Sequence, residues 1–384
     1  MKLLMYEGSA GFSSYTHKLC NALCEVSEDV EIFYITTRDN KEILGLNERV
    51  TLVPVLKDYD ESNKNSIRWF INRVYVSIYN IIRRNRMCRV CRYDVISIQF
   101  TIPIFDQFLI KKICKKYNVY YTAHDVIPPN KSRFWSMASL HSIYSLVPQI
   151  VVHTYGNKKQ LETHFGVDEG KISVIHHGME NDYIKRTKEQ CLHKLGIDSD
   201  NEFILLFYGA IREQKGLDDL IIALRDVDNA HLIIAGAMPY GESFDRYDHL
   251  IQENQVKVTK IIEYVPFELT EYLFQACDVV CLPYKYFYSQ SGVFMQSIQY
   301  RKPVIVSDVS SFGEYITKYK IGILCNPDDS IDLHNKIIEM KSLIMQNSDI
   351  FNIGLEKAAI ENSWYESAVK HLKVFSEKGH VDDQ

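Results

Sequence analysis

Short apolar runs alternate with amphipathic segments along almost the whole chain. In the first half the apolar runs are short and have few charges, which is typical of strands in a parallel sheet that helices cover on both faces. The strands predicted in this half are Lys2–Glu7, Val30–Ile35, Val50–Val55, Asp94–Phe100, Val119–Ala123, Gln149–His153 and Ile172–Ile175.

The same pattern restarts in the second half, after a polar stretch at 181–201. An apolar stripe with helical spacing begins at Leu217 and predicts an amphipathic helix there. Two successive series of strands and helices predict an α/β chain with two Rossmann-like, doubly wound domains facing each other across a cleft. The strands predicted in this half are Phe203–Tyr208, His231–Ala235, Val258–Glu263, Val279–Leu282, Val304–Ser307 and Gly322–Cys325.

Composition agrees with two globular domains and excludes several classes of protein. The chain has 384 residues, 46% hydrophobic and 24% charged, and its net charge of −5 does not favour a nucleic-acid binder. Nine scattered cysteines indicate reduced, buried thiols in a cytosolic protein, and the lone Cys88–Cys91 pair favours neither a zinc site nor a redox site. The N-terminus does not have the form of a signal peptide, and no apolar stretch is long enough to span a membrane.

Charge is divided unequally along the chain. Residues 1–180 hold 23 Lys+Arg and 18 Asp+Glu, a balance of +5, whereas the rest of the chain has a balance of −10. The positive excess comes from a basic arm at 62–93, which has eight cations, no acid and a helical apolar stripe. This arm either lies on an anionic membrane surface or is a core helix with a solvated arginine face. The cations predicted to meet the membrane are Arg68, Arg73, Arg83, Arg84 and Arg86.

Three loops that follow predicted strands contain glycine and lead into predicted helices. The loop at 8–14 contains Gly11 and is as consistent with a plain turn as with a ligand loop. In the loop at 208–216, Arg212 and Lys215 precede a helix N-terminus, an arrangement that suits a diphosphate better than two solvated surface charges. In the third loop, Ser291 can cap a helix and Gly292 lets a ligand approach the backbone. Two such helix termini favour a nucleoside diphosphate.

Histidines follow strands in the first half. His124 comes directly after the run Val119–Ala123, at the strand end where functional groups gather in α/β sheets. It could donate a hydrogen bond to a sugar hydroxyl or to developing charge, and an ordinary structural histidine is an equally good interpretation. The adjacent pair His176 and His177 does not by itself predict a metal site.

With these motifs, nearly the whole chain resembles glycosyltransferase family 4, the retaining, nucleotide-sugar-dependent transferases of the GT-B fold. The segments that carry the resemblance are 8–14, 124–128, 174–178, 209–217, 263–266, 276–284 and 302–308. The resemblance implies that Arg212 and Lys215 hold the donor diphosphate and, with His124 beside the donor sugar, form the catalytic set. It also implies that Gly11 closes over the phosphates and that the Val265 backbone meets the nucleobase. The implied donor is linked to UDP or GDP, with no metal and no further cofactor.

The chain departs from the family at a motif of two glutamates separated by seven residues. The corresponding positions hold Tyr288 and Gln296, so both carboxylates are missing. Gln296 could still bind ribose hydroxyls without charge assistance, and Tyr288 is a possible contact for the donor sugar. Ser291, Gly292 and Val293 become the better candidates for the donor, through backbone N–H groups and one hydroxyl.

These observations predict a cytoplasmic glycosyltransferase, possibly peripheral at the inner face of the membrane. Residues 1–185 are predicted to bind the acceptor and 186–362 the nucleotide sugar, while 363–384 form a helix that returns to the first domain. The predicted reaction transfers a sugar to a glycan or lipid-linked acceptor, with retention, in surface polysaccharide biosynthesis. The alternatives are a nucleotide-sugar epimerase of the same architecture and a non-catalytic, glycosyltransferase-like partner subunit.

Overall fold

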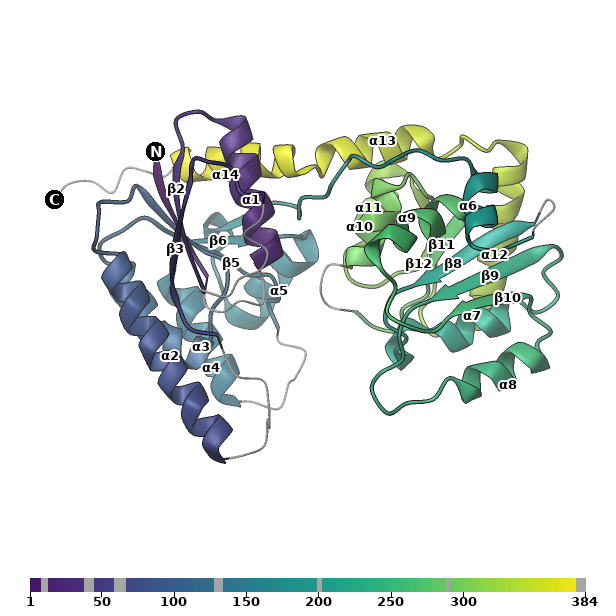
Figure 1. Cartoon of the computed structure of the whole chain (residues 1–384), viewed down its shortest axis with the longest axis horizontal. Coiled ribbons are helices and arrows are strands. Elements are labelled where there is room, and N and C mark those ends of the chain that lie inside the picture. Colours follow the sequence, from purple (N-terminus) through teal and green to yellow (C-terminus); the bar gives the residue numbers. More distant parts are fainter. Residues whose placement is uncertain are drawn as a thin grey trace. The chain divides into compact units, whose positions relative to one another are not determined.

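The chain forms two compact units, each built around its own parallel sheet (Figure 1). Unit 1 comprises 1–178 together with 364–384, and unit 2 comprises 179–363. The structure is a computed structural model that describes residues 1–7, 13–37, 45–58, 67–127, 134–198, 202–287 and 291–377. The predicted Gly11 and Tyr288 lie outside the described residues.

Unit 1 contains a seven-stranded sheet of order β3-β2-β1-β4-β5-β6-β7, in which every neighbouring pair is parallel. Its strands are β1 (Lys2–Tyr6), β2 (Glu31–Thr37), β3 (Val50–Leu56), β4 (Val95–Ile98), β5 (Val119–Thr122), β6 (Gln149–Val152) and β7 (Ile172–Val174). Its helices are α1 (Ser13–Val26), α2 (Ile67–Met87), α3 (Pro103–Ile113), α4 (Phe134–Leu146), α5 (Tyr155–Phe165), the short η3 (Glu169–Lys171) and α14 (Trp364–Glu377).

Alternation along β1 divides the core of unit 1 into two layers. Leu3 and Met5 point into a cluster with α1 and α14, whereas Leu4 and Tyr6 point into a cluster with α3, α4 and α5. Both sets are fully buried, as expected for a parallel sheet covered on both faces. The C-terminal helix α14 therefore packs beside α1 and completes the first unit (Figure 1).

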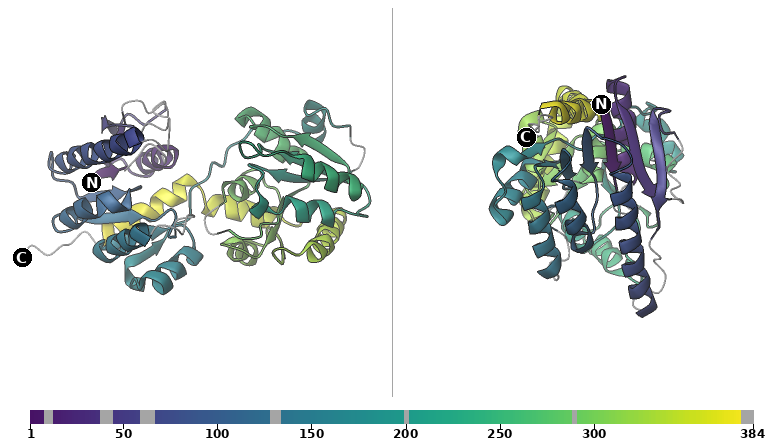
Figure 2. Two further views of the ribbon diagram at one scale, coloured as in Figure 1. Left: turned by 90° about the horizontal axis from the view of Figure 1, so that it is seen from below. Right: turned by 90° about the vertical axis from the view of Figure 1, so that its left-hand side faces the viewer.

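Helix α2, dark blue in Figure 2, lies at the periphery of unit 1 and corrects one sequence prediction. Arg84 is not a surface cation of the basic arm, because its side chain is 1% exposed and forms an ion pair with Asp106 at 2.7 Å. The guanidinium also lies 4.8 Å from the ring centroid of Tyr6. Burial raises the pKa of Asp106 although Arg84 opposes that shift. Arg84 thus attaches α2 to the protein core and is not available to lipid.

Unit 2 contains a six-stranded parallel sheet of order β10-β9-β8-β11-β12-β13. Its strands are β8 (Phe203–Tyr208), β9 (Ala230–Ala235), β10 (Val258–Ile261), β11 (Val279–Leu282), β12 (Val304–Ser307) and β13 (Gly322–Cys325). Its helices are α6 (Lys188–Lys194), η4 (Glu213–Lys215), α7 (Leu217–Ala223), α8 (Asp245–Glu253), α9 (Phe267–Ala276), α10 (Gly292–Gln299), α11 (Phe312–Tyr319), α12 (Ser330–Gln346) and α13 (Asn352–Glu361).

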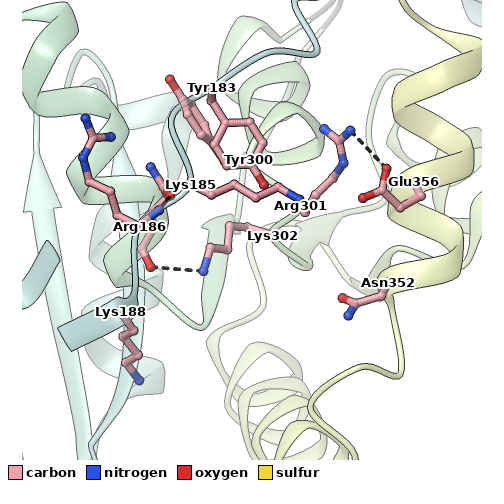
Figure 3. Close-up of a pocket in the computed structure, with 10 residues that line it drawn as sticks. Tyr183, Lys185, Arg186, Lys188, Tyr300, Arg301, Lys302, Asn352 and Glu356 are labelled. Carbon is pink, nitrogen blue, oxygen red and sulfur yellow. Dashed lines mark hydrogen bonds and ion pairs between the residues drawn. The ribbon is translucent and has the colours of Figure 1, made fainter. Parts of the chain in front are cut away.

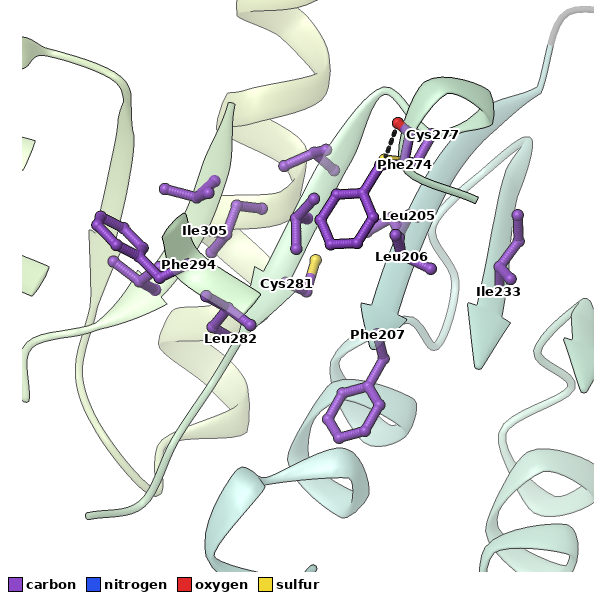
Figure 4. Packing of buried hydrophobic residues seen from close by; sticks show 14 of the residues in the cluster. Leu205, Leu206, Phe207, Ile233, Phe274, Cys277, Cys281, Leu282, Phe294 and Ile305 are labelled. Carbon is purple, nitrogen blue, oxygen red and sulfur yellow. Dashed lines mark hydrogen bonds between the residues drawn. The ribbon is translucent and has the colours of Figure 1, made fainter. Parts of the chain in front are cut away.

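The core of unit 2 is built from the apolar runs that predicted its strands. Leu205, Leu206 and Cys281 lie on the central strands, and Phe274 and Phe294 from the helices pack against them (Figure 4). Each of the thirteen predicted strands is present among the described residues, with ends that differ by three residues at most. The doubly wound α/β prediction is therefore confirmed for both units. All nine cysteines are free, and most are buried.

Candidate functional site

The donor-site residues predicted in the second half follow strands at the centre of unit 2. In the order β10-β9-β8-β11-β12-β13, the chain reverses direction across the sheet between β8 and β11. Ligands of doubly wound sheets bind at the carboxyl ends of the strands beside such a reversal. Arg212 and Lys215 follow β8, and Ser291 follows β11. The topology thus brings the two predicted loops to the same edge of the sheet.

The loop after β8 is held in place by backbone contacts. Gly216 has φ +67°, and a Cβ there would lie 2.0 Å from the carbonyl oxygen of Pro283, so only glycine fits. The backbone N–H of Lys285 donates to the carbonyl oxygen of Gln214 at 2.9 Å. The loop that carries both predicted cations is therefore fastened to the segment that follows β11.

Lys215 lies in the middle of this arrangement, whereas Arg212 is exposed. The Lys215 Nζ is 5.5 Å from the ring centroid of Tyr284. A Cβ on Gly209 would lie 3.0 Å from that Nζ and 3.3 Å from the side chain of Val293, so these three residues are neighbours. Burial, assisted by the charge of Arg212, lowers the pKa of Lys215 to about 8. The ammonium is thus poorly solvated, and an anion placed beside it would stabilise the charged form of Lys215.

Ser291 forms the predicted cap of α10. Its hydroxyl accepts a hydrogen bond from the backbone N–H of Phe294 at 3.3 Å and lies 3.3 Å from the Tyr284 hydroxyl. Gly292 is exposed, and a Cβ there would meet no atom within 4 Å. Gln296 is half-buried one turn further along the helix. Tyr284 thus touches Ser291 through its hydroxyl and faces Lys215 with its ring, which joins the two loops.

Val265 follows a third strand end. It is buried in the loop between β10 and α9, and β10 lies two strands along from β8. The structure therefore places Val265 at the same edge of the sheet as Arg212 and Lys215 but further from the central reversal. Its role toward the nucleobase stays a prediction.

Sequence reasoning missed two residues that organise this site. Tyr284 bridges the loops as described, and Lys285 forms ion pairs with Asp218 at 3.2 Å, Asp219 at 3.2 Å and Asp328 at 2.8 Å. These contacts raise the pKa of Lys285 and fix the first turn of α7, directly after the cation loop. The one signal in the sequence was the pair of adjacent aspartates at the start of that predicted helix, whose mutual repulsion a nearby cation relieves.

His124 lies in unit 1, at the carboxyl end of β5, within a cluster of aromatic and histidine rings. Its Nδ1 is 3.0 Å from His153 Nε2, and its ring is 4.6 Å from that of Tyr15. Burial, with His177 and His371 nearby, lowers the pKa of His124 to about 3. His124 is therefore neutral at physiological pH.

Hydrogen bonding assigns the tautomer of His124. His153 Nδ1 lies 2.9 Å from the carbonyl oxygen of Ile175, which can only accept, so the His153 proton is on Nδ1. His153 Nε2 must then accept from His124 Nδ1–H. The sequence suggested that His124 could donate to a sugar, but in this tautomer its Nδ1–H is donated to His153.

A pocket of about 360 Å³ lies elsewhere in unit 2, and none of the described donor-site residues lines it (Figure 3). Its lysines and arginines are largely engaged within the protein. Arg186 pairs with Glu271 at 2.7 Å, Arg301 pairs with Glu356 at 3.1 Å, and Lys302 donates to two backbone carbonyls. Lys302 lies two residues before β12, so the pocket lies toward the amino ends of the strands. We therefore assign it a structural role.

The other cations of the predicted basic arm lie on α2. Arg68 and Arg86 are exposed, whereas Arg73 and Arg83 are half-buried against the rings of Trp69 and Tyr79. Within the part of the chain that the structure describes, no helix is both long and apolar enough to cross a bilayer. No group of three or more potential metal ligands is found among the same residues.

Comparison with known proteins agrees with this architecture. Residues 10–183 match the family model described as Glycosyltransferase Family 4, and residues 192–349 match the model described as Glycosyl transferases group 1. An uncharacterized glycosyltransferase of Methanocaldococcus jannaschii is 26% identical over 45% of this chain and 47% of its own length. An uncharacterized 41.2 kDa protein in the cps region of Klebsiella pneumoniae is 26% identical over 65% of this chain and 68% of its own length.

A solved structure extends the likeness to the whole fold. HepE of Anabaena, crystallised with UDP, covers 98% of this chain and 100% of its own with a TM-score of 0.73 and 15% identity. By contrast, the chain spans about half the length of the first curated relatives that it matches. The two family models together account for most of the chain. The chain therefore belongs to the glycosyltransferases of the GT-B fold, with a family 4 domain followed by a group 1 domain.

Proposed function

We propose that the chain transfers a sugar from a nucleotide-sugar donor to a glycan or lipid-linked acceptor. The observation that carries this proposal is the position of Lys215, an incompletely solvated ammonium held between Tyr284 and Gly209 at the central reversal of the sheet in unit 2. A donor diphosphate would supply the charge that this ammonium lacks. The likeness to HepE, which binds UDP and UDP-glucose, supports a UDP-linked donor, and a GDP-linked donor is the other candidate.

Each predicted residue then has a chemical task. Arg212 and Lys215 neutralise the diphosphate as it leaves, and no metal is required for that step. The backbone N–H groups at the start of α10, at Gly292 and Val293, face the same anion. His124 lies near the donor sugar, as the resemblance to the family implies. We expect retention of configuration, as the resemblance to the family implies, with the acceptor hydroxyl attacking the sugar from the side of the departing diphosphate.

The biological setting is part of the same proposal. A relative is a protein in the cps region of Klebsiella pneumoniae, which supports a role in surface polysaccharide biosynthesis. The acceptor would be a growing glycan on a lipid carrier, and the enzyme would work in the cytoplasm at the inner face of the membrane. The exposed apolar side of α2 supports this location.

Donor binding is tested by thermal stabilisation with a panel of nucleotide sugars, since a ligand that binds the folded state raises its apparent stability. We expect Arg212→Ala with Lys215→Ala to weaken binding by roughly 100-fold or more, because two charge-assisted contacts of about 1.5–3 kcal/mol each are lost. Lys194→Ala with Arg225→Ala is the matched control, because both residues are exposed cations of unit 2. Unchanged donor binding in the first variant would refute the assignment.

A second variant tests the predicted approach of the donor to the backbone of Gly292. A Cβ at this position meets no protein atom within 4 Å, so Gly292→Ala does not disturb packing, and alanine is the better helix former. We expect unchanged or slightly higher thermal stability but at least about tenfold weaker donor binding, because the methyl group occupies the ligand's space. A variant that binds the donor like the wild type would exclude close approach at this position.

The two alternatives make different products. An epimerase converts the nucleotide sugar without an acceptor and leaves its diphosphate intact, so release of free nucleoside diphosphate that depends on an acceptor excludes it. A non-catalytic partner would release none under any condition, and its Arg212→Ala/Lys215→Ala variant would still support polysaccharide production in cells. Loss of polysaccharide in that variant, with normal protein levels, favours the enzyme.

A further inference from the structure

Helix α2 presents its apolar side away from the protein. Its buried residues are Val76, Ser77, Asn80 and Arg84, of which three are polar. Six large apolar residues of the helix, which we call the α2 apolar face, are between 49% and 81% exposed, whereas Ile81 and Met87 pack against the core of unit 1. This face consists of Ile67, Phe70, Ile71, Tyr75, Ile78 and Ile82.

Helical geometry makes this face continuous. At about 100° per residue, its six members span roughly 140° of the helix, and the buried residues lie on the other side. An ordinary surface helix has the reverse arrangement, with its apolar stripe against the core. The interpretation of the basic arm as a core helix with a solvated arginine face does not account for these six exposed side chains. A contiguous group of exposed apolar side chains marks a surface that binds another protein or a membrane.

Cations and aromatic rings border the face. Arg68 and Arg86 project at its edge, and both are exposed. The Lys57 ammonium lies 3.1 Å from the Tyr75 hydroxyl and 4.5 Å from the centroid of the Tyr79 ring. The sequence contains no acid between 62 and 93, and the acid that pairs with α2, Asp106, is buried. Amphipathic aromatic side chains and a basic border are the features that place a helix at a lipid–water interface.

The charges also decide which partner fits the face. In a symmetric dimer of this chain, the same face would meet its own copy, and the arginine borders would oppose arginine borders with no acid on the helix to compensate. An anionic bilayer offers acyl chains to the isoleucines and negative headgroups to the border cations at the same time.

We propose that unit 1 docks on an anionic membrane by inserting the α2 apolar face among the lipids, with Arg68 and Arg86 against the headgroups. Insertion of the apolar side chains supplies most of the free energy of membrane binding, and the attraction between the cations and the headgroups adds to it. The inference deepens the proposed function by naming the surface that would meet a lipid-linked acceptor, but docking itself can be measured without any transfer reaction.

The test is sedimentation of the full chain with vesicles of phosphatidylglycerol and phosphatidylcholine, compared with phosphatidylcholine alone. We expect wild-type protein to bind the anionic vesicles and the apolar-face variant to bind at least about tenfold more weakly. Its control removes three exposed isoleucines from helices of unit 2 and should bind like the wild type. The apolar-face variant is Ile71→Ser/Ile78→Ser/Ile82→Ser, and the control is Ile331→Ser/Ile353→Ser/Ile360→Ser.

A charge variant separates the electrostatic contribution to vesicle binding from the contribution of the apolar side chains. Arg68→Ser with Arg86→Ser should weaken binding by about fivefold for each cation at low salt and by less at high salt. All substituted side chains are exposed, so circular dichroism and the melting temperature should match those of the wild type. The donor-induced thermal shift, measured without vesicles, reports on the proposed function separately.

Two results would overturn the inference. Equal sedimentation of the wild type and the apolar-face variant would show that the face does not meet lipid. A wild-type dimer in gel filtration that the apolar-face variant converts to monomer, without vesicle binding by either, would assign the face to a second copy of the chain.

Discussion

Lys215 makes donor binding dependent on pH in a way that can be calculated. Burial and the neighbouring Arg212 lower the pKa of its ammonium to about 8 in the free protein, from an ordinary value of 10.5. A diphosphate beside it favours the charged form and returns the pKa toward that ordinary value. Binding must therefore take up protons wherever the free protein has partly lost them.

The sign and size of the effect follow from linkage. Below pH 8 Lys215 is charged in both states and affinity is at its maximum; as the pH rises above 8, the free protein deprotonates first and affinity falls. With the two pKa values above, we expect donor affinity to decrease about tenfold between pH 7 and pH 9. At pH 8 the binding reaction should take up about half a proton.

Isothermal titration calorimetry measures this uptake directly. The nucleotide sugar that stabilises the protein best is titrated at pH 8 in buffers with different ionisation enthalpies, and the dependence of the observed heat on buffer gives the number of protons. Lys215→Arg is the matched control, because guanidinium stays charged throughout this range. It should bind without proton uptake. A wild type that takes up no proton, or a Lys215→Arg variant with the same buffer dependence, would refute the reasoning.

Three further predictions concern stability. Arg84→Met leaves the buried Asp106 charge uncompensated and should lower the free energy of unfolding by about 3–5 kcal/mol, whereas Arg84→Met with Asp106→Leu should recover most of the loss in urea titrations. Burial lowers the pKa of His371 to about 4, so the unfolded chain binds more protons below pH 6.5 and stability is lost as the pH falls. Between pH 7 and pH 5, a His371→Gln variant should lose less stability than the wild type by on the order of 2 kcal/mol, measured by denaturant unfolding. Ser291→Ala removes the cap of α10 and should cost about 1 kcal/mol, seen as a lower melting temperature, while Ser291→Thr keeps most of it.

The strands could be predicted because each one is identified by the apolar pattern of its own residues. Runs such as Phe203–Tyr208 and Val279–Leu282 are apolar at every position, and such runs form the buried strands of a parallel sheet. The Ser291 cap was predictable for the same reason, because a serine before an apolar helical pattern needs only its own neighbours to act. Parallel strand order then places the loops at one edge, so most of the candidate donor site follows from the sequence.

The parts that could not be predicted depend on contacts between distant residues. Arg84 was counted as a surface cation because its neighbours in the sequence are surface cations, but its partner Asp106 lies 22 residues away on another helix. The His124 tautomer is set by His153 and, through it, by the Ile175 carbonyl. The α2 stripe predicted an amphipathic helix, but only the tertiary structure shows which side of it faces the protein.

The electrostatic surroundings of Lys215 explain why an anionic ligand would shift its protonation. A carboxylate near this ammonium would hold its proton and keep its pKa high. At the second glutamate position the chain has neutral Gln296, and among the described residues the charge that acts on Lys215 is the cation Arg212. The Ser291 hydroxyl is already engaged with Phe294 and Tyr284, so it supports the helix terminus and leaves the ligand to the backbone at Gly292. In the proposed complex, the donor diphosphate would be the principal counter-charge of the site, and its binding would be coupled to the protonation of Lys215.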